Sequence, residues 1–161
     1  MMHENGKLLF VKYAVPTIAT GAAVLEIGPS RRRHDLREAI PEARYHYADI
    51  RNFGIGPGRV RMKDGYAIEC DDNAFDCVFA AQVVEHVANP FRWIAELKRV
   101  ARKTVIVIAP VSFEYHCPPD HWRIFAEGMR ALFDSANMKT VLAVTESLDG
   151  KHTDTIGIAE K

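Results

Sequence analysis

The chain has 161 residues, a length at which one hydrophobic core suffices, so we expect a single domain over residues 1–161. Its 21 basic and 21 acidic residues cancel, which argues against the general nucleic-acid binding that a strong positive charge produces. Three cysteines without a C-x-x-C pair, no membrane-spanning run and no signal-peptide pattern in Met1–Pro16 predict a cytoplasmic protein that has no membrane partner.

Strands and helices are predicted to alternate in the first half of the chain. Ala22–Ile27 is an apolar strand with one carboxylate, the Gly28-Pro29-Ser30 segment breaks it, and the charged residues that follow indicate a helix. A second strand covers Tyr45–Ile50, and the short apolar run Phe75–Ala80 is typical of a strand buried in a parallel sheet.

The second half continues the alternation and ends in two adjacent strands. Asn89 and Pro90 are a matched helix start, and Phe91, Ile94, Leu97 and Ala101 supply a face to bury. A strand over Thr104–Ala109, a helix over Ala126–Ala136 and strands over Thr140–Thr145 and Thr155–Ala159 complete the prediction. We therefore expect an α/β, Rossmann-like three-layer sandwich with a mostly parallel sheet and an antiparallel C-terminal edge hairpin.

The first strand and its turn carry the argument for a nucleotide-like cofactor. In Rossmann-like sheets, ligands bind at the carboxyl ends of the strands. Gly28 would let backbone approach such a ligand, and Asp49, at the end of the next strand, could accept both hydroxyls of a ribose. NAD binding needs the later glycines of G-x-G-x-x-G for its pyrophosphate, but Ser30 and Arg33 stand at those positions. S-adenosylmethionine has no phosphate and can dispense with them.

Several blocks, in order between Val24 and Pro110, resemble the class I S-adenosylmethionine-dependent methyltransferases, particularly their small-molecule branch. The family's first motif, E-x-G-x-G, corresponds to the segment that starts at Glu26, and its D-A-x-x-L-P-F-x-D-x-S-F-D pattern matches Asp64–Asp76 without a gap. The family's V-L-E-H-V block appears as Val83–Val87, and its E-x-x-R-V block as Glu96–Val100.

The resemblance implies S-adenosyl-L-methionine as the cofactor and a set of residues around it. Glu26, Gly28 and Ser30 would surround the methionine part, while Ala81 and Gln82 would face the sulfonium. Asp49 would bind the ribose, with Ile50 beside it. Asp64 and Gly65 would bind the adenine. Simpler interpretations exist, because Glu26 could cap a helix, Asp49 could be a turn carboxylate, and Asp76 is interpreted as structural.

The loop Tyr115–Arg123 follows the fifth strand, on the side where this fold places acceptor contacts. His116 or His121 is the predicted general base, because histidine titrates near neutral pH, with Tyr115, Asp120 and Arg123 orienting the acceptor. The alternative is that Trp122 and Arg123 only pin the loop. No metal site is predicted, because a full ligand set from this one loop is improbable. His86 is interpreted as a packed, hydrogen-bonded histidine.

The function predicted from the sequence is methyl transfer to a small-molecule acceptor, with glycan or secondary-metabolite pathways suggested by the resemblance of Asp120–Arg123 to a subset of these enzymes. A non-catalytic, methyltransferase-like binding or scaffold protein is the alternative from another class. An NAD-dependent oxidoreductase is a further alternative, disfavoured by the missing glycines.

Overall fold

The computed structural model describes residues 4–29, 36–51 and 58–161. It is built around one six-stranded sheet of order β2-β1-β5-β6-β8-β7. The strands are β1 (Ala23–Ile27), β2 (Arg44–Ala48), β5 (Phe75–Ala81), β6 (Ala101–Pro110), β7 (Lys139–Glu146) and β8 (Asp154–Glu160). The first four are parallel to one another, whereas β8 runs antiparallel to both β6 and β7.

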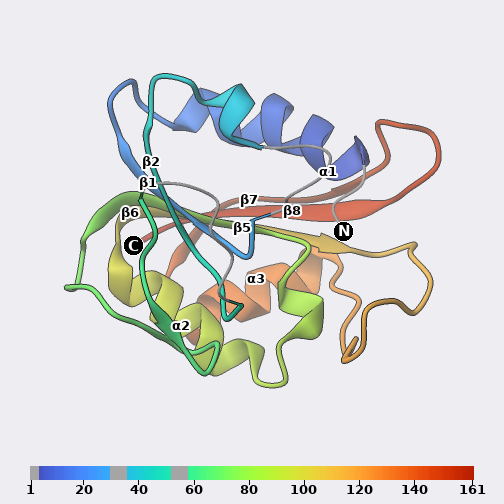
Figure 1. Ribbon diagram of the computed structural model, residues 1–161. Coiled ribbons are helices and arrows are strands. Elements are labelled where there is room, and N and C mark those ends of the chain that lie inside the picture. The colour runs from blue at the N-terminus through green and yellow to red at the C-terminus, as the bar shows by residue number, and fades with distance from the viewer. Residues whose placement is uncertain (1–3, 30–35, 52–57) are drawn as a thin grey trace.

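Helical segments cover both faces of the sheet (Figure 1). On one face lie α2 (Pro90–Val100) and α3 (Ala126–Ser135). The other face is covered by an N-terminal segment that consists of α1 (Glu4–Leu9), a π-helical turn (Phe10–Ala14) and a 3-10 turn (Val15–Thr17). The α/β three-layer fold with a mostly parallel sheet and an antiparallel edge hairpin is therefore confirmed.

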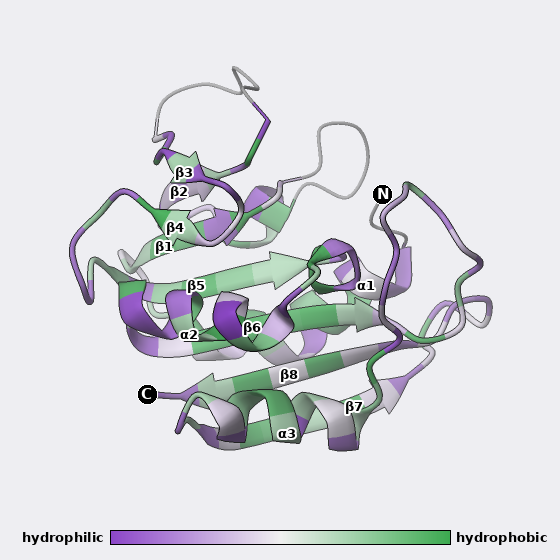
Figure 2. Cartoon of the chain, turned by 90° about the horizontal axis from the view of Figure 1, so that it is seen from below, coloured by the Kyte–Doolittle hydropathy of each residue, from purple (hydrophilic) through white to green (hydrophobic). Residues whose placement is uncertain are grey.

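Each face has its own hydrophobic core. Trp93, Ile94 and Leu97 of α2 and Met129 and Phe133 of α3 are fully buried on one side. On the other side, Leu9, Phe10 and Ala14 pack with residues of the inner strands and with the 3-10 turn Leu36–Ala39. All five residues of β1 are buried, as expected for a central strand with both faces covered. Figure 2 shows the apolar composition of the inner strands.

Local sequence signals predicted the start of α2 correctly, but not all of the residues on its buried face. The Asn89 side chain accepts a hydrogen bond from the Arg92 N–H at 3.0 Å, which confirms the predicted cap. The prediction that Phe91 is buried is wrong: Phe91 is 58% exposed, because it lies off the buried face of α2, which consists of Pro90, Trp93, Ile94, Leu97 and Val100. Ala101, also expected on the helix, is instead the first residue of β6.

Two further segments differ from the sequence prediction or fall outside the description. The start of the helix expected after Gly28 would fall in residues 30–35, which lie outside the described residues, and Leu36–Ala39 forms a 3-10 turn. The N-terminal helical segment was not predicted. The small antiparallel hairpin of β3 (Met62–Lys63) and β4 (Ala67–Ile68) was not predicted either. In the described part of the chain, no helix has the length and apolar character needed to cross a membrane.

Candidate active site

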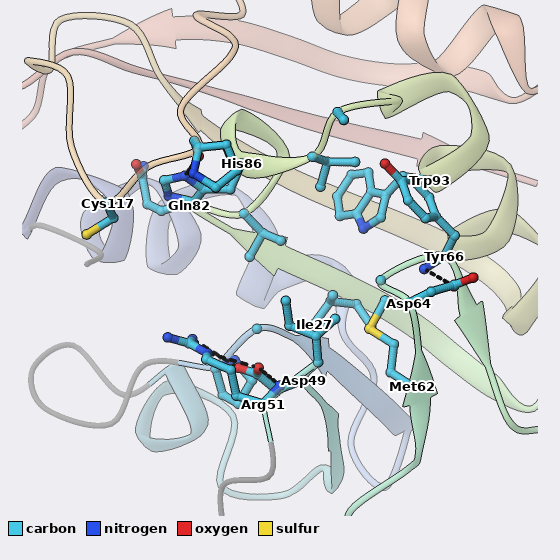
Figure 3. A pocket seen from close by; sticks show the side chains of 18 of the residues that line it. Ile27, Asp49, Arg51, Met62, Asp64, Tyr66, Gln82, His86, Trp93 and Cys117 are labelled. Atoms are coloured by element: carbon cyan, nitrogen blue, oxygen red, sulfur yellow. Dashed lines mark hydrogen bonds and ion pairs between the residues drawn. The ribbon is translucent and has the colours of Figure 1, made fainter.

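A pocket of about 660 Å³ opens at the carboxyl ends of β1, β2 and β5, and Figure 3 shows its lining. This volume lies within the range of small-molecule and cofactor sites. The structure brings together every predicted cofactor residue that it describes, and all of them line this pocket: Glu26, Gly28, Asp49, Ile50, Asp64, Gly65, Ala81 and Gln82. Ser30, the ninth, lies outside the described residues.

Gly28 is the point where β1 turns away from the sheet. Its φ is +67°, and a Cβ atom placed there would come within 2.7 Å of Val83 Cγ2. Its N–H donates to the carbonyl of Ala48 at 2.8 Å, which ties the turn to the end of β2. Both the backbone conformation and the close approach of Val83 therefore favour glycine at this position.

Two buried carboxylates stand at the ends of the neighbouring strands β1 and β2. Glu26 is 5% exposed and accepts a hydrogen bond from the Tyr45 hydroxyl. Asp49 is 4% exposed and accepts the N–H of Arg51 at 2.7 Å, while the Arg51 Nε lies 3.1 Å from Asp49 Oδ1. The Arg51 side chain is 62% exposed. The start of the helix that Glu26 could cap would fall in residues 30–35, outside the described residues.

Asp64 and Gly65 form the turn between β3 and β4 at the mouth of the pocket. Both have positive φ, 51° and 77°, and the Tyr66 N–H donates to the Lys63 carbonyl at 3.2 Å, a geometry that favours the Asp-Gly pair. Ile50 is 67% exposed, and its Cγ2 would lie 3.5 Å from a Cβ atom built on Gly65. These residues form an open, partly apolar edge of the pocket.

Gln82 follows β5 and is held by a buried polar network. Its Nε2 donates to Asp154 Oδ1 at 2.9 Å, and Asn5 Nδ2 donates to the other oxygen of Asp154 at 2.7 Å. Asn5, Gln82 and Asp154 are all buried, with Asn5 and Asp154 fully so. The network therefore connects the N-terminal helix to the wall of the pocket. Sequence reasoning missed Asn5 and Asp154, which lie 149 positions apart.

The two predicted catalytic histidines both lie in the loop after β6, but only one of them lines the pocket. His121 lines the pocket and is exposed, whereas His116 is outside the lining and its side chain is only 13% exposed. Tyr115, Asp120 and Arg123 do not line the pocket either. The loop also contributes Cys117, Pro118 and Pro119 to the wall.

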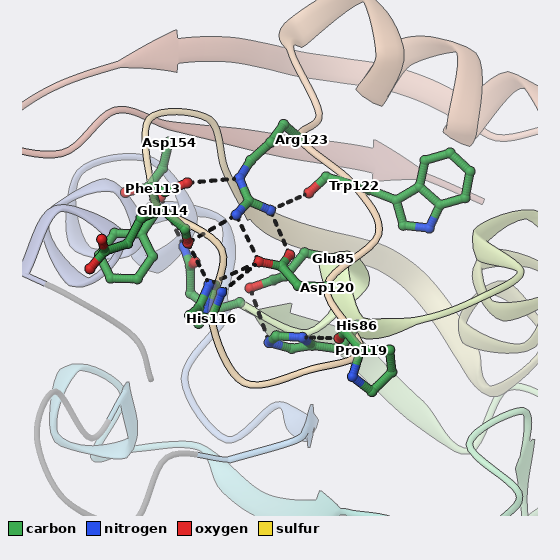
Figure 4. Close-up of polar contacts among 11 residues, drawn as sticks. Glu85, His86, Phe113, Glu114, His116, Pro119, Asp120, Trp122, Arg123 and Asp154 are labelled. Atoms are coloured by element: carbon green, nitrogen blue, oxygen red, sulfur yellow. Dashed lines mark hydrogen bonds and ion pairs between the residues drawn. The ribbon is translucent and has the colours of Figure 1, made fainter.

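Asp120 and Arg123 bind each other, as Figure 4 shows. The guanidinium of Arg123 donates to both carboxylate oxygens of Asp120, at 2.6 and 2.8 Å, and this contact holds the pKa of Asp120 well below its usual value. Arg123 also donates to the carbonyl of Phe113, and the Trp122 indole donates to the carbonyl of Val87 at 2.8 Å. These contacts support the interpretation in which Trp122 and Arg123 pin the loop.

Glu85, which sequence reasoning did not select, lies between this loop and the pocket. Its side chain is fully buried, and desolvation raises its pKa to about 8. His86 lines the pocket, donates from Nδ1 to the Pro119 carbonyl at 2.7 Å, and has a pKa that burial lowers. The sequence signal that could have selected Glu85 is its carboxylate within the mostly apolar segment Val83–Val87.

Asp76 is structural, as expected, since it accepts hydrogen bonds from the Ala23 N–H and from Arg102.

Comparisons with known proteins agree with this architecture. A family model described as a methyltransferase domain matches residues 36–109. A methyltransferase structure from Aquifex aeolicus is 16% identical with a TM-score of 0.69 and covers 96% of this chain and 90% of its own. Magnesium protoporphyrin IX methyltransferase from Synechocystis with bound S-adenosylmethionine is 15% identical with a TM-score of 0.68, and the match covers 97% of this chain and 80% of the methyltransferase.

A third similar structure has a different activity in its name. The [4+2]-cyclase SpnF is 16% identical with a TM-score of 0.70 and covers 97% of this chain and 80% of its own. No curated protein matches the sequence. Residues 36–109 thus match a methyltransferase-domain model, and the chain has the fold of solved S-adenosylmethionine-dependent methyltransferases, with a pocket at the carboxyl ends of its parallel strands.

Proposed function

We propose that the pocket binds S-adenosylmethionine and that the protein transfers its methyl group to a small-molecule acceptor. The observation that carries this proposal is the convergence of Glu26, Asp49, Asp64 and Gln82 on one pocket. These residues come from four different segments of the chain. The resemblance selected them as cofactor residues from the sequence alone, and the fold brings them together at the edge where Rossmann-like sheets bind ligands.

The charges of the pocket suit the proposed cofactor. S-adenosylmethionine carries a positive ammonium and a positive sulfonium, and its ribose offers two hydroxyl donors. Asp49 accepts the ribose hydroxyls once Arg51 moves aside, and Glu26 with the Gly28 turn faces the methionine part. Asp64, Gly65 and Ile50 border the adenine, and Ala81 and Gln82 the sulfonium. Each carboxylate thereby gains a donor or a positive charge from the ligand.

Methyl transfer needs mainly alignment of the two reactants and exclusion of water. The lone pair of the acceptor attacks the methyl carbon, the carbon–sulfur bond breaks, and sulfur keeps its electron pair to give S-adenosylhomocysteine. When the acceptor atom carries a proton, His121 accepts it, because it is the predicted histidine that lines the pocket. His116, outside the lining, has no direct path to the acceptor. A sugar or secondary metabolite is the acceptor class that the Asp120–Arg123 segment favours.

The test is calorimetric titration with S-adenosylhomocysteine. We expect one-to-one binding that Asp49→Asn weakens at least about tenfold, because the charge-assisted hydrogen bonds to the ribose are lost. Asp71→Asn is the matched control, since Asp71 is exposed and outside the pocket lining, and it should bind as the parent does. Absence of binding by the parent, or binding of NAD in its place, would overturn the proposal.

A second candidate function is a methyltransferase-like protein that binds ligand without transferring a methyl group. The similarity to a [4+2]-cyclase supports this second candidate, because the same architecture occurs there in a protein named for other chemistry. A radiolabelled methyl donor separates the two candidates. Label transferred to sugars or phenolic metabolites supports methyl transfer, whereas tight binding of S-adenosylhomocysteine without transfer to any of them supports the second candidate.

A further inference from the structure

Three potential ligand atoms meet beside the pocket. One carboxylate oxygen of Glu85 and one ring nitrogen each of His86 and His116 all lie within 4.8 Å of one another. The two imidazole rings are edge to face, with centroids 5.1 Å apart, and Figure 4 shows both beside Glu85. The cluster joins the turn after β5 to the loop after β6, two segments separated by 30 positions.

The partner of His86 determines which of its nitrogens faces the cluster. Nδ1 lies 2.7 Å from the carbonyl oxygen of Pro119, which can only accept, so Nδ1 carries the proton. In the neutral ring, Nε2 therefore has a free lone pair. It lies 3.7 Å from Glu85 Oε1.

His116 is oriented in the same way by two acceptors. Its Nδ1 lies 3.1 Å from the Glu114 carbonyl and 3.2 Å from Asp120 Oδ2, and Arg123 fixes that carboxylate from the other side. Nδ1 thus carries the proton, and Nε2 offers a lone pair. This Nε2 is buried and has no hydrogen-bond partner.

Glu85 adds two more acceptors without a donor. Its side chain is fully buried, and neither carboxylate oxygen has a hydrogen-bond partner. Buried polar atoms normally have partners, so this group of unpartnered oxygen and nitrogen atoms is incomplete. A cation at the centre would give each of the three side chains a partner.

We propose that Glu85, His86 and His116 bind one divalent transition-metal cation of the zinc type. Two imidazoles and one carboxylate are a common ligand set for such ions and leave a further coordination position for water or substrate. The Nδ1–H contacts to a carbonyl and a carboxylate are the kind that orient metal-binding histidines. Ligand atoms of a tetrahedral zinc site lie about 3.4 Å apart, so shifts of about 1 Å would close the cluster around the ion.

The site borders the proposed methyl-transfer pocket because His86 lines that pocket as well. The prediction of no metal considered only the loop Tyr115–Arg123. The structure differs because a single histidine of that loop combines with Glu85 and His86, while Asp120 is held by Arg123. Metal binding by these three residues does not depend on the cofactor, so it can hold or fail independently of methyl transfer.

The test uses chelator-treated protein titrated with Zn²⁺ by calorimetry. We expect one-to-one binding that Glu85→Gln and His116→Gln each weaken at least about 100-fold, since each removes one of three protein ligands. The matched control is His152→Gln, because His152 also pairs with a carboxylate, Asp149, at 2.6 Å but lies outside the cluster. It should bind Zn²⁺ as the parent does.

Two readouts keep the test independent of folding and of activity. Circular dichroism verifies that the variants are folded, and Co²⁺ reports through its visible absorption whether nitrogen and oxygen ligands surround it at low coordination number. Titration with S-adenosylhomocysteine should stay within about threefold of the parent in Glu85→Gln. No Zn²⁺ binding by the parent, or equal binding by the folded Glu85→Gln and His116→Gln variants, would overturn the proposal and leave a proton shared between Glu85 and His86.

Discussion

The carboxylates at the amino and carboxyl ends of the parallel strands differ in how they are partnered. At the amino end, Asp76 is the second residue of β5 and both of its oxygens are occupied, one by the Ala23 N–H at 2.9 Å and one by Arg102 at 2.9 Å. A smaller pocket of about 250 Å³ lies beside it, lined in part by Thr17, Gly21 and Thr104. This edge is complete without a ligand.

The carboxyl edge is not complete in the same sense. Five buried side-chain polar atoms lack a hydrogen-bond partner in the part of the chain that the structure describes, and four of them belong to Gln82, Glu85 and His116. All three residues follow the carboxyl ends of β5 or β6. The comparison teaches that unpartnered polar atoms, rather than carboxylates as such, distinguish the edge that we propose to bind ligands.

Replacing Gly28 should give the largest effect, because it changes the turn on which the cofactor edge depends. Gly28→Ala combines a positive φ with a Cβ atom 2.7 Å from Val83 Cγ2. We expect the free energy of unfolding to fall by about 2–4 kcal/mol, from left-handed strain and overpacking together, and the affinity for S-adenosylhomocysteine to fall at least about tenfold. Urea denaturation and calorimetry measure the two losses.

Gly150→Ala is the matched control for that change. Gly150 has nearly the same φ, +69°, but no atom lies within 4 Å of the added Cβ. Its loss should be limited to about 1 kcal/mol, with unchanged ligand affinity. Equal losses for the two variants would show that backbone conformation alone, and not the approach of Val83, requires glycine at position 28.

Removing Arg123 tests whether the loop after β6 is held by its ion pair. Arg123→Gln leaves the fully buried side chain of Asp120 without its main partner, and we expect a loss of about 2–4 kcal/mol of stability. Arg102→Gln at the amino edge should cost about 1 kcal/mol or less, because the Arg102 side chain is 53% exposed. Affinity for S-adenosylhomocysteine should change less than about threefold in Arg123→Gln, whereas a tenfold loss would place Arg123 in ligand binding.

Replacing Asp76 should give the smallest effect, and one that disappears in acid. The Ala23 N–H, and then Arg102, lower its pKa below the ordinary value of 3.8, so its contribution to stability is present above that pH and is lost as the pH falls through the lowered value. At neutral pH, Asp76→Asn should be less stable than the parent by about 1–2 kcal/mol. The difference should vanish in strong acid; a difference independent of pH would mean that the charge of Asp76 does not contribute.

Local sequence signals predicted most of the strands and the cofactor edge of the pocket. Asn89 and Pro90 marked the start of α2 because capping depends on neighbouring residues only. Glu26 and Asp49 could be selected because strand order places the carboxyl ends of β1 and β2 side by side, whatever the rest of the chain does. The roles of these residues stay predictions until ligand binding is measured.

Contacts between distant segments could not be predicted in this way. The approach of His116 to Glu85 depends on how the loop after β6 folds back, which the Asp120–Arg123 pair decides. The N-terminal helical segment was also missed, because it changes from α-helical to π-helical geometry after one and a half turns and shows no regular period. Its burial of Leu9 and Phe10 comes from tertiary packing.

Asn5 makes this N-terminal segment part of a cooperative unit. Its side chain donates to Asp154 and to the Glu146 carbonyl and accepts the Leu148 N–H at 2.6 Å, so it joins α1 to both strands of the C-terminal hairpin. Asp154 in turn holds Gln82 at the pocket. Opening of the first helix would therefore loosen the sheet edge and the pocket wall together, and slow amide exchange in β7 and β8 should depend on a residue about 140 positions earlier in the chain.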